Sequence, residues 1–363
     1  MKKSRTTIKI TASNLMLYAK NLLVAAGADE ANAETAAAIL VEADLKGVSV
    51  QGVDYLYYII DCLKRGIIHG SAKPAIIKET ESTALIDGNR GLGQPAAVMA
   101  IDVATKKART TGTASVAITN STDIFMIGAY SERLAKNGLV GMVMTSGPPL
   151  VHPYGGVERL LSTNPISIAI PRRGNDPLVL DMATSALASS RIRQAMYYDE
   201  KVPPGTGIGP DGMSTTDAKD IRKGALSPMA GHKGYGLALC IGLLCGPMTG
   251  SGIGPELAGW QATGATQTQG HFFYAVDPAC FVDYDNFLDR TEWYINVIKN
   301  SCKAEGVDEI LVPGERGAAM RRGQQQHGVE VLEKTWKVLS EHAKALGVDR
   351  PEHDFGEKEE GGR

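Results

Sequence analysis

The stretch Leu180-Asp181-Met182-Ala183-Thr184-Ser185 decides the fold, because we expect an apolar strand to end in it and a helix to open after it. Asp181 at the strand end can orient a catalytic group or accept a hydrogen bond from a ribose hydroxyl. Thr184 and Ser185 offer hydroxyls and backbone amides that suit a phosphate. An ordinary helix cap is the alternative interpretation of Asp181. The stretch therefore predicts a polar strand end that can hold a ligand.

Apolar residues on either side of this stretch alternate between the spacing of helices and the spacing of strands. A first helix is expected to start in Thr11-Ala12-Ser13-Asn14. Further helices are expected over residues 29–46, 55–65, 96–111, 127–137, 234–245, 290–305 and 329–346. Strands are expected over residues 75–78, 84–87, 114–119, 139–145, 166–170, 178–181, 272–276 and 310–312. Such a mixture predicts an α/β (mixed α+β) protein.

Changes in this pattern divide the chain into three regions and a tail. We expect an N-terminal helical domain over residues 1–75, with residues 318–350 packing on it. Residues 76–125 and 300–317 are expected to form a connecting or substrate region, and residues 126–299 a cofactor-binding domain. The charged, glycine-containing residues 351–363 predict a disordered tail.

The composition of the 363 residues is that of an ordinary globular protein, with 43% hydrophobic and 21% charged residues. A net charge of −2 gives no reason to expect nucleic acid or an anionic membrane as partner. The 5 cysteines are irregularly spaced, so neither a disulfide framework nor a zinc site is expected, and no metal site is predicted. With no apolar signal core or membrane-spanning run, we expect a cytoplasmic protein.

The segment Gly91-Leu92-Gly93-Gln94-Pro95-Ala96 has the outline of a dinucleotide-binding fingerprint between a strand and a helix. The next strand ends in Ile118-Thr119-Asn120, without the carboxylate that would hold the ribose. Pro95 also removes an amide that the loop would offer to the pyrophosphate. We therefore favour a tight loop over an active site rather than a Rossmann unit.

Four further polar segments accompany the stretch at residues 180–185. They are Leu161-Ser162-Thr163-Asn164-Pro165, Gly231-His232-Lys233-Gly234-Tyr235-Gly236-Leu237, Gly270-His271-Phe272-Phe273 and Leu311-Val312-Pro313-Gly314-Glu315-Arg316-Gly317. Lys233 at a glycine-rich helix start supplies a cation where a carboxylate or phosphate would lie, and a solvated surface lysine is the alternative. Asn164 can hold a carboxamide or a carbonyl.

In this combination and order the five segments resemble the malate/L-lactate dehydrogenase family of the second type, from about residue 10 to residue 348. That family includes ureidoglycolate dehydrogenase, diketogulonate reductase, sulfolactate dehydrogenase and the cyclic-imine reductase acting on piperideine-2-carboxylate. The resemblance implies a homodimer that binds NAD or NADP in a non-Rossmann domain with a largely antiparallel sheet, beside a helical domain made from both chain ends. The cofactor-binding residues that it implies are Ser121, Asn164, Asp181, Met182, Ala183, Thr184, Lys233, Gly234, Pro313, Gly314 and Glu315.

Two segments depart from the family pattern. Family members typically have Asp-Leu-Arg-Gly-x-x-Ser-His-Gly-Val-x-Arg where this chain has residues 44–55, so that Ser, His and the final Arg are replaced by Val50, Gln51 and Tyr55. The family signature Asn-Ser-x-His-x-Gly becomes residues 120–125, with Asp123 for His and Phe125 for Gly. The resemblance thus implies that both imidazoles used for proton transfer and one substrate-binding cation are lost.

Hydride transfer to a carbonyl needs a proton donor for the developing alkoxide. Gln51 can only form hydrogen bonds, whereas Asp123 can supply a proton if burial raises its pKa. His152 and Tyr55 are further candidates, and Lys233 completes the set of expected catalytic residues. Tyr55, Asp123 and Thr163 are the expected substrate contacts.

The missing arginine points away from a simple 2-oxo acid held by an arginine clamp. Candidates for a contact to an NADP 2′-phosphate are Arg172, Arg173, Arg191 and Arg193.

The sequence therefore predicts an NAD(P)-dependent oxidoreductase that acts on a C–O or C–N bond of a small metabolite. One alternative is an imine reductase of the cyclic-imine carboxylate type, since a protonated iminium needs no strong acid. A catalytically inactive homologue that binds only cofactor or ligand is the alternative from another class. The retained segments around Asn164, Asp181 and Lys233 argue against such decay.

Overall fold

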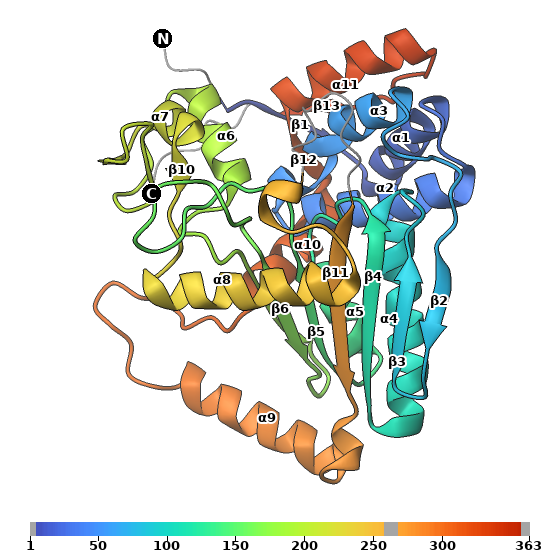
Figure 1. Cartoon of the computed structure of the whole chain (residues 1–363), viewed down its shortest axis with the longest axis vertical. Helices are drawn as coiled ribbons and strands as arrows, with labels where there is room; N and C mark the ends of the chain where they lie inside the picture. The colour runs from blue at the N-terminus through green and yellow to red at the C-terminus, as the bar shows by residue number, and fades with distance from the viewer. Residues whose placement is uncertain (1–4, 258–267, 357–363) are drawn as a thin grey trace.

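The computed structural model describes residues 5–257 and 268–356 and arranges them around a seven-stranded sheet (Figure 1). The strand order across the sheet is β2 (Ala75–Glu79), β3 (Thr83–Asp87), β4 (Thr113–Ser121), β11 (Gln269–Val276), β5 (Val140–Thr145), β6 (Ile166–Ile170), β7 (Leu178–Met182). Of these neighbours, β3 and β4 pair in parallel and the other pairs are antiparallel. The predicted mixed α/β fold with a largely antiparallel sheet is confirmed.

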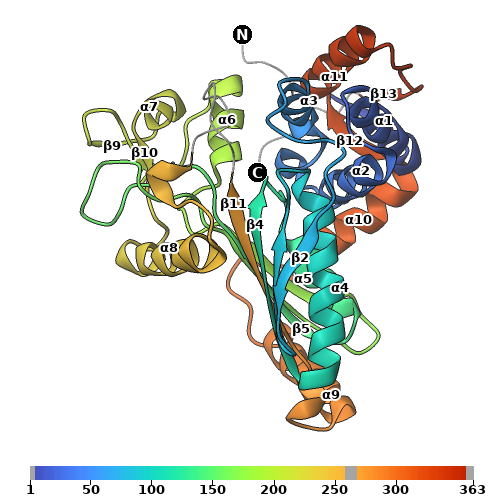
Figure 2. The same cartoon turned by 45° about the vertical axis from the view of Figure 1, so that its right-hand side comes forward.

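Helices cover both faces of the sheet (Figure 2). α4 (Gly93–Thr111) and α5 (Gly128–Lys136) pack on one face, and α8 (His232–Cys245) packs on the other. Alternate residues of β4 are buried, as expected for a strand whose side chains point to two faces in turn. Val116, Ile118 and Ile101 lie in the core between the sheet and α4. Removing this apolar surface from water is the main force that holds the layers together.

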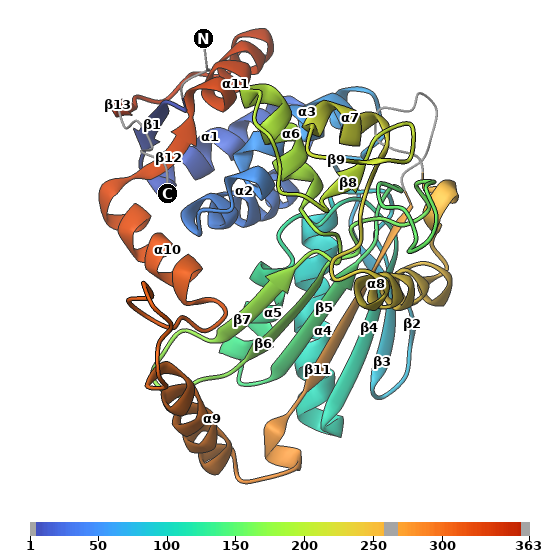
Figure 3. The ribbon, with the colours of Figure 1, turned by 90° about the vertical axis from the view of Figure 1, so that its left-hand side faces the viewer.

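Both ends of the chain meet in a helical unit at one end of the sheet (Figures 1 and 3). Its elements are β1 (Thr7–Ile10), α1 (Ala12–Ala25), α2 (Glu30–Leu45), α3 (Leu56–Lys64), α10 (Glu315–His327), β12 (Val329–Leu332), α11 (Glu333–Leu346) and β13 (Asp354–Gly356). The rings of Tyr18 and Trp336 are 5.2 Å apart, and the Tyr18 hydroxyl donates to the Leu339 carbonyl at 3.2 Å. Apolar side chains from the two ends therefore share one core.

A buried carboxylate fixes the corner between α2 and α3, which we define as residues 43–55. The Val53 N–H donates to the Asp44 carboxylate at 2.8 Å. A Cβ on Gly52 would lie 2.3 Å from either Asp44 carboxylate oxygen, so only glycine fits there. The chain passes this corner in two short 3-10 helices, η1 (Ser49–Gln51) and η2 (Val53–Tyr55). The corner is therefore a compact turn that carries Gln51 and Tyr55 on a fixed backbone.

A small lobe stands beside the corner, with its own apolar core around Ile192 and Leu226. It contains α6 (Ser189–Tyr198), β8 (Gly207–Ile208), β9 (Ser214–Thr215), α7 (Ala218–Lys223) and β10 (Ala225–Leu226). α6 contacts η1 of the corner, so the lobe and the helical unit meet there (Figure 3). The short helices η3 (Pro247–Thr249), η4 (Gly254–Glu256) and η5 (Pro278–Cys280) and the peripheral helix α9 (Tyr284–Lys299) complete the fold.

Some expectations from the sequence need correction. Residues 329–332 form a strand rather than the start of a helix, because their alternating burial allows β12 to pair with β1. Residues 310–312 form no strand: Ile310 is half-buried, Leu311 is exposed and Val312 is buried. In the expected tail, residues 354–356 pair with the open edge of β1, whereas residues 357–363 lie outside the described part of the chain.

The sheet also runs across the boundary expected at residue 125, since β2 to β4 and β5 to β7 belong to it together. The division into regions stays a prediction. Within the described residues, no helix has the length and apolar character needed to cross a membrane.

Candidate active site

A cleft of about 600 Å³ opens between the corner, the lobe and one end of the sheet. Gln51 and Tyr55 line it from the corner, Asp123 and Phe125 from the loop after β4, and Arg193 from α6. Among the residues expected to bind substrate or act in catalysis, the structure therefore brings Gln51, Tyr55, Asp123 and Thr163 together in one cleft. Gln51 and Tyr55 lie in the same cleft as Asp123 because the corner and the loop after β4 both form part of its wall.

Asp123 is a half-buried residue, and the pKa of its carboxyl group is raised because burial disfavours the charged form, although backbone N–H groups of Phe125 and Ile124 oppose the shift. The N–H of Phe125 donates to the Oδ1 of Asp123 at 2.8 Å. The side chain is thus held against its own loop, and its raised pKa favours retention of a proton. This combination suits a group that exchanges a proton with a ligand in the cleft.

The glycine loop at residues 91–93 supports the segment that carries Asp123. The Thr122 hydroxyl donates to the Gly91 carbonyl at 2.9 Å, and a Cβ on Gly93 would lie 2.4 Å from the Thr122 carbonyl oxygen. Gly93 thus lets two backbones approach closely. The glycines that outline a dinucleotide fingerprint accordingly accommodate the residues 122–123 instead of a pyrophosphate.

Phe125 has a left-handed backbone conformation, with φ of +59°, at the position where the family signature has glycine. Such a conformation is strained for a side chain as large as phenylalanine. The ring is nevertheless buried and lies 5.1 Å from the ring of Tyr55. The loop therefore has a backbone conformation that favours glycine, and the side chain of Phe125 packs against Tyr55.

Arg193 supplies a cation to the cleft from α6. Its guanidinium lies 4.4 Å from the centre of the Tyr55 ring, donates to Asp54 at 2.7 Å and donates to the Tyr57 hydroxyl at 3.2 Å. Burial raises the pKa of Tyr55 to about 12, although Arg193 opposes the shift. Tyr55 is therefore neutral at physiological pH and can act as a hydrogen-bond donor.

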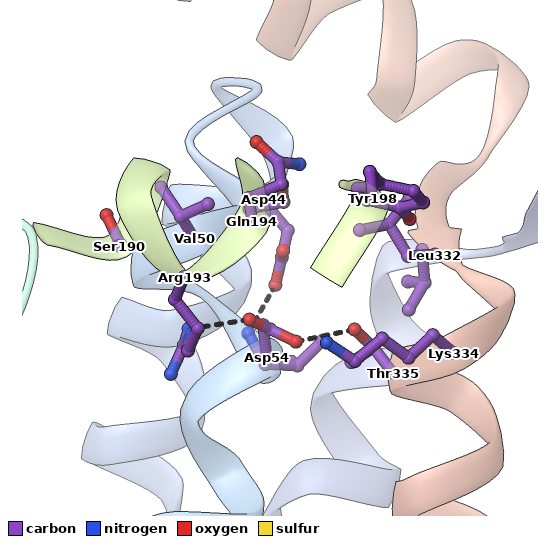
Figure 4. A pocket seen from close by; sticks show the side chains of 13 residues that line it. Asp44, Val50, Asp54, Ser190, Arg193, Gln194, Tyr198, Leu332, Lys334 and Thr335 are labelled. Carbon is purple, nitrogen blue, oxygen red and sulfur yellow. Dashed lines mark hydrogen bonds and ion pairs between the residues drawn. The ribbon is translucent and has the colours of Figure 1, made fainter. Parts of the chain in front are cut away.

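A smaller cavity of about 20 Å³ adjoins the cleft and has room for about one water molecule (Figure 4). Asp44, Val50, Asp54 and Arg193 contribute to its wall. The pKa of Asp44 is raised well above its ordinary value by burial, despite the bond from Val53. Val50, which stands where the family has serine, thus lies beside the cavity and not in the cleft.

His271 is a buried histidine next to the cleft that remains neutral. Its Nδ1 lies 2.7 Å from the Thr145 hydroxyl and its Nε2 lies 3.0 Å from the Thr122 carbonyl oxygen. Burial lowers its pKa to about 4, although the bond to Thr122 opposes the shift. Because a carbonyl can only accept, Nε2 carries the proton and Nδ1 accepts from Thr145. His271 therefore orients Thr145, which lines the cleft.

His152 lies outside the set of residues that line the cleft. Its Nδ1 is 2.8 Å from the Pro153 carbonyl oxygen, and its Nε2 is 3.1 Å from the Ser227 hydroxyl. Both ring nitrogens are thus engaged, Nδ1 within its own loop and Nε2 with Ser227 beside the lobe. A proton relay through His152 has no support in this arrangement.

The Asp181 carboxylate accepts a hydrogen bond from the N–H of Gly128 at 2.8 Å, so it caps the start of α5 from the neighbouring edge strand. Burial of the carboxylate raises its pKa to about 6, against the effects of Gly128 and Lys46. Much of the residue as a whole is open to solvent. We therefore expect solvent to moderate this shift.

The segments around Thr184 and Lys233 are joined to each other. The Thr184 carbonyl accepts from the Met229 N–H at 2.9 Å, and the Met229 carbonyl accepts from Gly234 at the start of α8. The Thr184 hydroxyl donates to the Thr163 and Asn164 carbonyls at 2.9 and 3.1 Å. Thr184 therefore ties the end of β7 to the wall of the cleft.

Other predicted cofactor residues lie around these segments. Lys233 is exposed and makes no ion pair with any described residue. The Asn164 amide donates to the Ala238 carbonyl at 2.7 Å, while its Oδ1 is buried without a partner among the described residues. Ser121 is fully buried and donates to the Thr122 carbonyl at 3.2 Å.

The Pro313–Gly314–Glu315 segment docks on the edge strand β7. The Val179 N–H donates to the Pro313 carbonyl at 3.0 Å, and Glu315 pairs with Lys299 at 2.7 Å. Neither this segment nor residues 181–184 are among the residues that line the cleft. The structure therefore distributes the predicted site over the cleft, the start of α8 and the edge of β7.

Of the four arginines considered for a 2′-phosphate, two are engaged on α9. Arg172 pairs with Glu292 at 2.8 Å, and Arg173 pairs with Asp285 and Asp289. Sequence analysis did not identify Ser146, Ser190, Arg159 and Arg222 as part of the cleft. They come from loops and from the ends of short helices, for which an apolar period gives no signal.

The chain matches the model of the malate/L-lactate dehydrogenase family over residues 10–340. The chain belongs to this family. It is 34% identical to a malate/(S)-sulfolactate dehydrogenase of Methanothermus fervidus, over 90% of this chain and 95% of that one. It is 33% identical to a (2R)-3-sulfolactate dehydrogenase (NADP+) of Chromohalobacter salexigens, over 83% of this chain and 88% of that one. It is 27% identical to a ureidoglycolate dehydrogenase (NAD+) of Escherichia coli O157:H7, over 92% and 95%.

Solved structures agree with this assignment. The malate dehydrogenase of Entamoeba histolytica superimposes with a TM-score of 0.91 and 27% identity, over 95% of this chain and 99% of that one. A Δ1-piperideine-2-carboxylate reductase of Pseudomonas syringae gives a TM-score of 0.84 and 28% identity, over 92% and 99%. The predicted family is confirmed, as is the prediction of a dehydrogenase or reductase that uses NAD or NADP.

The left-handed backbone at Phe125 predicts an unusual order of stability among its variants. Loss of the buried ring costs about 3–5 kcal/mol in either Phe125→Ala or Phe125→Gly. Glycine avoids a strain of about 1–2 kcal/mol that alanine retains. We therefore expect Phe125→Gly to have the higher denaturation midpoint of the two.

Phe273 in β11 is the matched control, because it is fully buried without a positive φ. There the alanine variant is expected to be more stable than the glycine variant, since glycine loses more backbone freedom. If the order at Phe125 equals the order at Phe273, strain at Phe125 is contradicted.

Proposed function

We propose that the chain is an NAD(P)-dependent oxidoreductase that transfers a hydride between the nicotinamide and a C–O or C–N bond of a small metabolite. The observation that supports this most is the cleft, where Gln51, Tyr55 and Asp123 occupy the positions of the family's two histidines and its arginine. These residues meet in a family member whose scaffold is otherwise retained. An active enzyme with an altered proton relay explains this arrangement better than a homologue that has lost its catalytic activity.

The cleft has features that fit a nicotinamide cofactor. Its volume of about 600 Å³ lies within the range usual for ligand and cofactor sites. The hydroxyls of Ser146 and Ser190 in its wall are buried without partners among the described residues, and a bound polar ligand would satisfy them. Arg159 and Arg222 line it, and the charge of Arg222 adds to burial in lowering the pKa of Arg159. An anionic phosphate would relieve this repulsion.

The cofactor supplies the hydride from its nicotinamide ring when bound. The chain supplies the proton, and Asp123 is the group best placed to give it, because burial keeps its carboxyl protonated to a higher pH than usual. Tyr55 and Gln51 donate hydrogen bonds that orient the oxygen atom of the substrate. In the oxidative direction the ionised Asp123 takes the proton from the substrate hydroxyl.

An imine reductase is the second candidate, and Asp123 is again the reason. A protonated iminium already carries the proton that a carbonyl substrate must receive. An ionised Asp123 would then stabilise the positive charge of the substrate as a buried counter-ion. A structural relative of this chain is a Δ1-piperideine-2-carboxylate reductase, which supports keeping this candidate.

Cofactor binding followed by a substrate panel tests the proposal. We expect NADH or NADPH fluorescence to change on titration with the protein, and malate, sulfolactate, ureidoglycolate and piperideine-2-carboxylate then to be screened at the nicotinamide absorbance. Turnover of any hydroxy acid supports the first candidate, and turnover of the imine alone supports the second. Absence of cofactor binding would reject the enzyme, and binding with no turnover of any compound would favour the inactive homologue.

The role of Asp123 predicts a pH dependence. In the direction of carbonyl reduction the protonated carboxyl is the active form, so kcat should fall as pH rises through its elevated pKa. Asp123→Asn should remove this limb and lower kcat by at least about 100-fold. Asp102→Asn, an exposed change on α4, is the control and should leave the profile unchanged. If Tyr55→Phe removes the limb and Asp123→Asn does not, Tyr55 is the donor instead.

We also propose a homodimer, because α9 leaves a large apolar surface exposed. Among its 16 residues, Leu288 and Ile295 are the buried ones, while Trp293, Tyr294 and Val297 are about half exposed. Contiguous apolar patches of this kind usually mark an interface. Light scattering should give twice the mass of one chain, and Trp293→Glu with Val297→Glu should give one chain mass. A monomeric wild-type protein would refute this proposal.

A further inference from the structure

The cleft regains a cation at the place where the family pattern has lost one. The family has arginine at the position of Tyr55, and the sequence alone suggested that no arginine clamp remains. In the structure the guanidinium of Arg193 lies 4.4 Å from the centre of the Tyr55 ring. The charge therefore comes from α6 of the lobe and stacks on the side chain that replaced the family's arginine.

Three neighbours fix the plane of this guanidinium. The Tyr55 ring covers one face, Asp54 accepts from Nη2 at 2.7 Å, and the Tyr57 hydroxyl is 3.2 Å from Nη1. Asp54 is itself held by the Thr335 hydroxyl at 2.6 Å, so the pair is anchored to α11 (Figure 4). A guanidinium has five N–H donors, and bonds to described residues use two of them.

The remaining donors of Arg193 are available to a ligand. The side chain is 29% exposed and lines the cleft together with Asp123 and Gln51. A planar guanidinium that is already oriented loses little freedom when it binds a carboxylate or sulfonate through two parallel bonds. Burial alone would lower the pKa of Arg193. The nearby Tyr55, Asp54 and Tyr57 outweigh this effect and raise the pKa, so Arg193 stays cationic.

We infer that Arg193 is the specificity-determining residue that binds the anionic group of the substrate, in place of the arginine that the family has at position 55. The inference rests on the proposed function to the extent that the cleft is the substrate site. Asp54 balances part of the charge and thereby lowers the affinity of the site for anions.

Binding of oxamate, a carboxylate analogue of a 2-oxo acid, tests the inference without any turnover. Calorimetric titrations of the full chain are made with and without NADH or NADPH, and ethyl oxamate serves as the uncharged probe. Arg193→Met should weaken oxamate binding by at least about tenfold, which corresponds to about 1.4 kcal/mol. Ethyl oxamate binding should be unchanged. Arg65→Met is the matched control, because Arg65 forms an exposed ion pair with Asp61 on α3.

A second variant separates anion binding from a structural role of the ion pair. Asp54→Asn keeps the size of the side chain and frees the charge of Arg193, so oxamate should bind several-fold more tightly than to the wild type. Arg193→Lys should restore part of the affinity, since it retains charge but not the planar fork. Thermal unfolding of each variant verifies that it is folded.

Equal oxamate affinity of wild type and Arg193→Met would overturn the inference, and so would unchanged or weaker binding by Asp54→Asn. Failure of the wild type to bind oxamate in either state would also overturn it. Loss of the proposed function has a different signature, namely no binding of NADH or NADPH while the oxamate titration still depends on Arg193.

Discussion

The site depends on one buried interaction, the contact of the Asp44 carboxylate with the backbone of the corner. This carboxylate receives the N–H of Val53 and presses against Gly52, where a side chain would collide with it. Gln324 of α10 donates to the Asp44 and Leu45 carbonyls at 2.8 and 3.1 Å, which joins the C-terminal part of the chain to the same point. A buried carboxylate without such partners would be costly, so the turn and the acid stabilise each other.

Every cleft residue of the corner inherits its position from this turn. Gln51 and Tyr55 line the cleft together with Asp123. Asp54, which lies with Tyr55 in η2, accepts a hydrogen bond from Arg193 of α6. On the opposite side, the glycines at 91 and 93 allow the Asp123 loop to approach closely. Where the family pattern has two histidines and an arginine, the cleft thus has Gln51, Asp123 and Tyr55, and the guanidinium of Arg193 enters from α6.

The periodicity of apolar residues predicted most of the sheet and its covering helices, because these elements bury alternate or every third to fourth residue. It failed at Val329–Leu332, where four residues are too few to distinguish a strand from the helix that follows. It also missed α10, in which Gln324 is the buried residue and no apolar stripe exists. The pattern within one segment does not show whether that segment pairs with a distant strand, and β12 is a strand because it pairs with β1.

The sequence could predict the site residues that lie in short motifs. It could not predict those that the fold brings together from distant parts of the chain. Gln51, Tyr55, Asp123 and Thr163, which were singled out from short sequence motifs, line one cleft, and their roles there stay predictions. His152 has the right chemistry but uses both ring nitrogens elsewhere. Arg193 was considered only for a phosphate, because its sequence position lies 138 residues from Tyr55, and only the fold shows that their side chains are stacked.

The backbone at Phe125 adopts a conformation that its own residue type does not favour. The chain there still follows the path that a glycine would choose, although a large aromatic side chain now stands on it. The surrounding contacts, and not the preference of phenylalanine itself, thus hold this dihedral angle, because the ring is buried and packs against Tyr55. The loop that carries Asp123 therefore stores conformational strain beside the cleft, and the contact between the Phe125 and Tyr55 rings couples that strain to the corner.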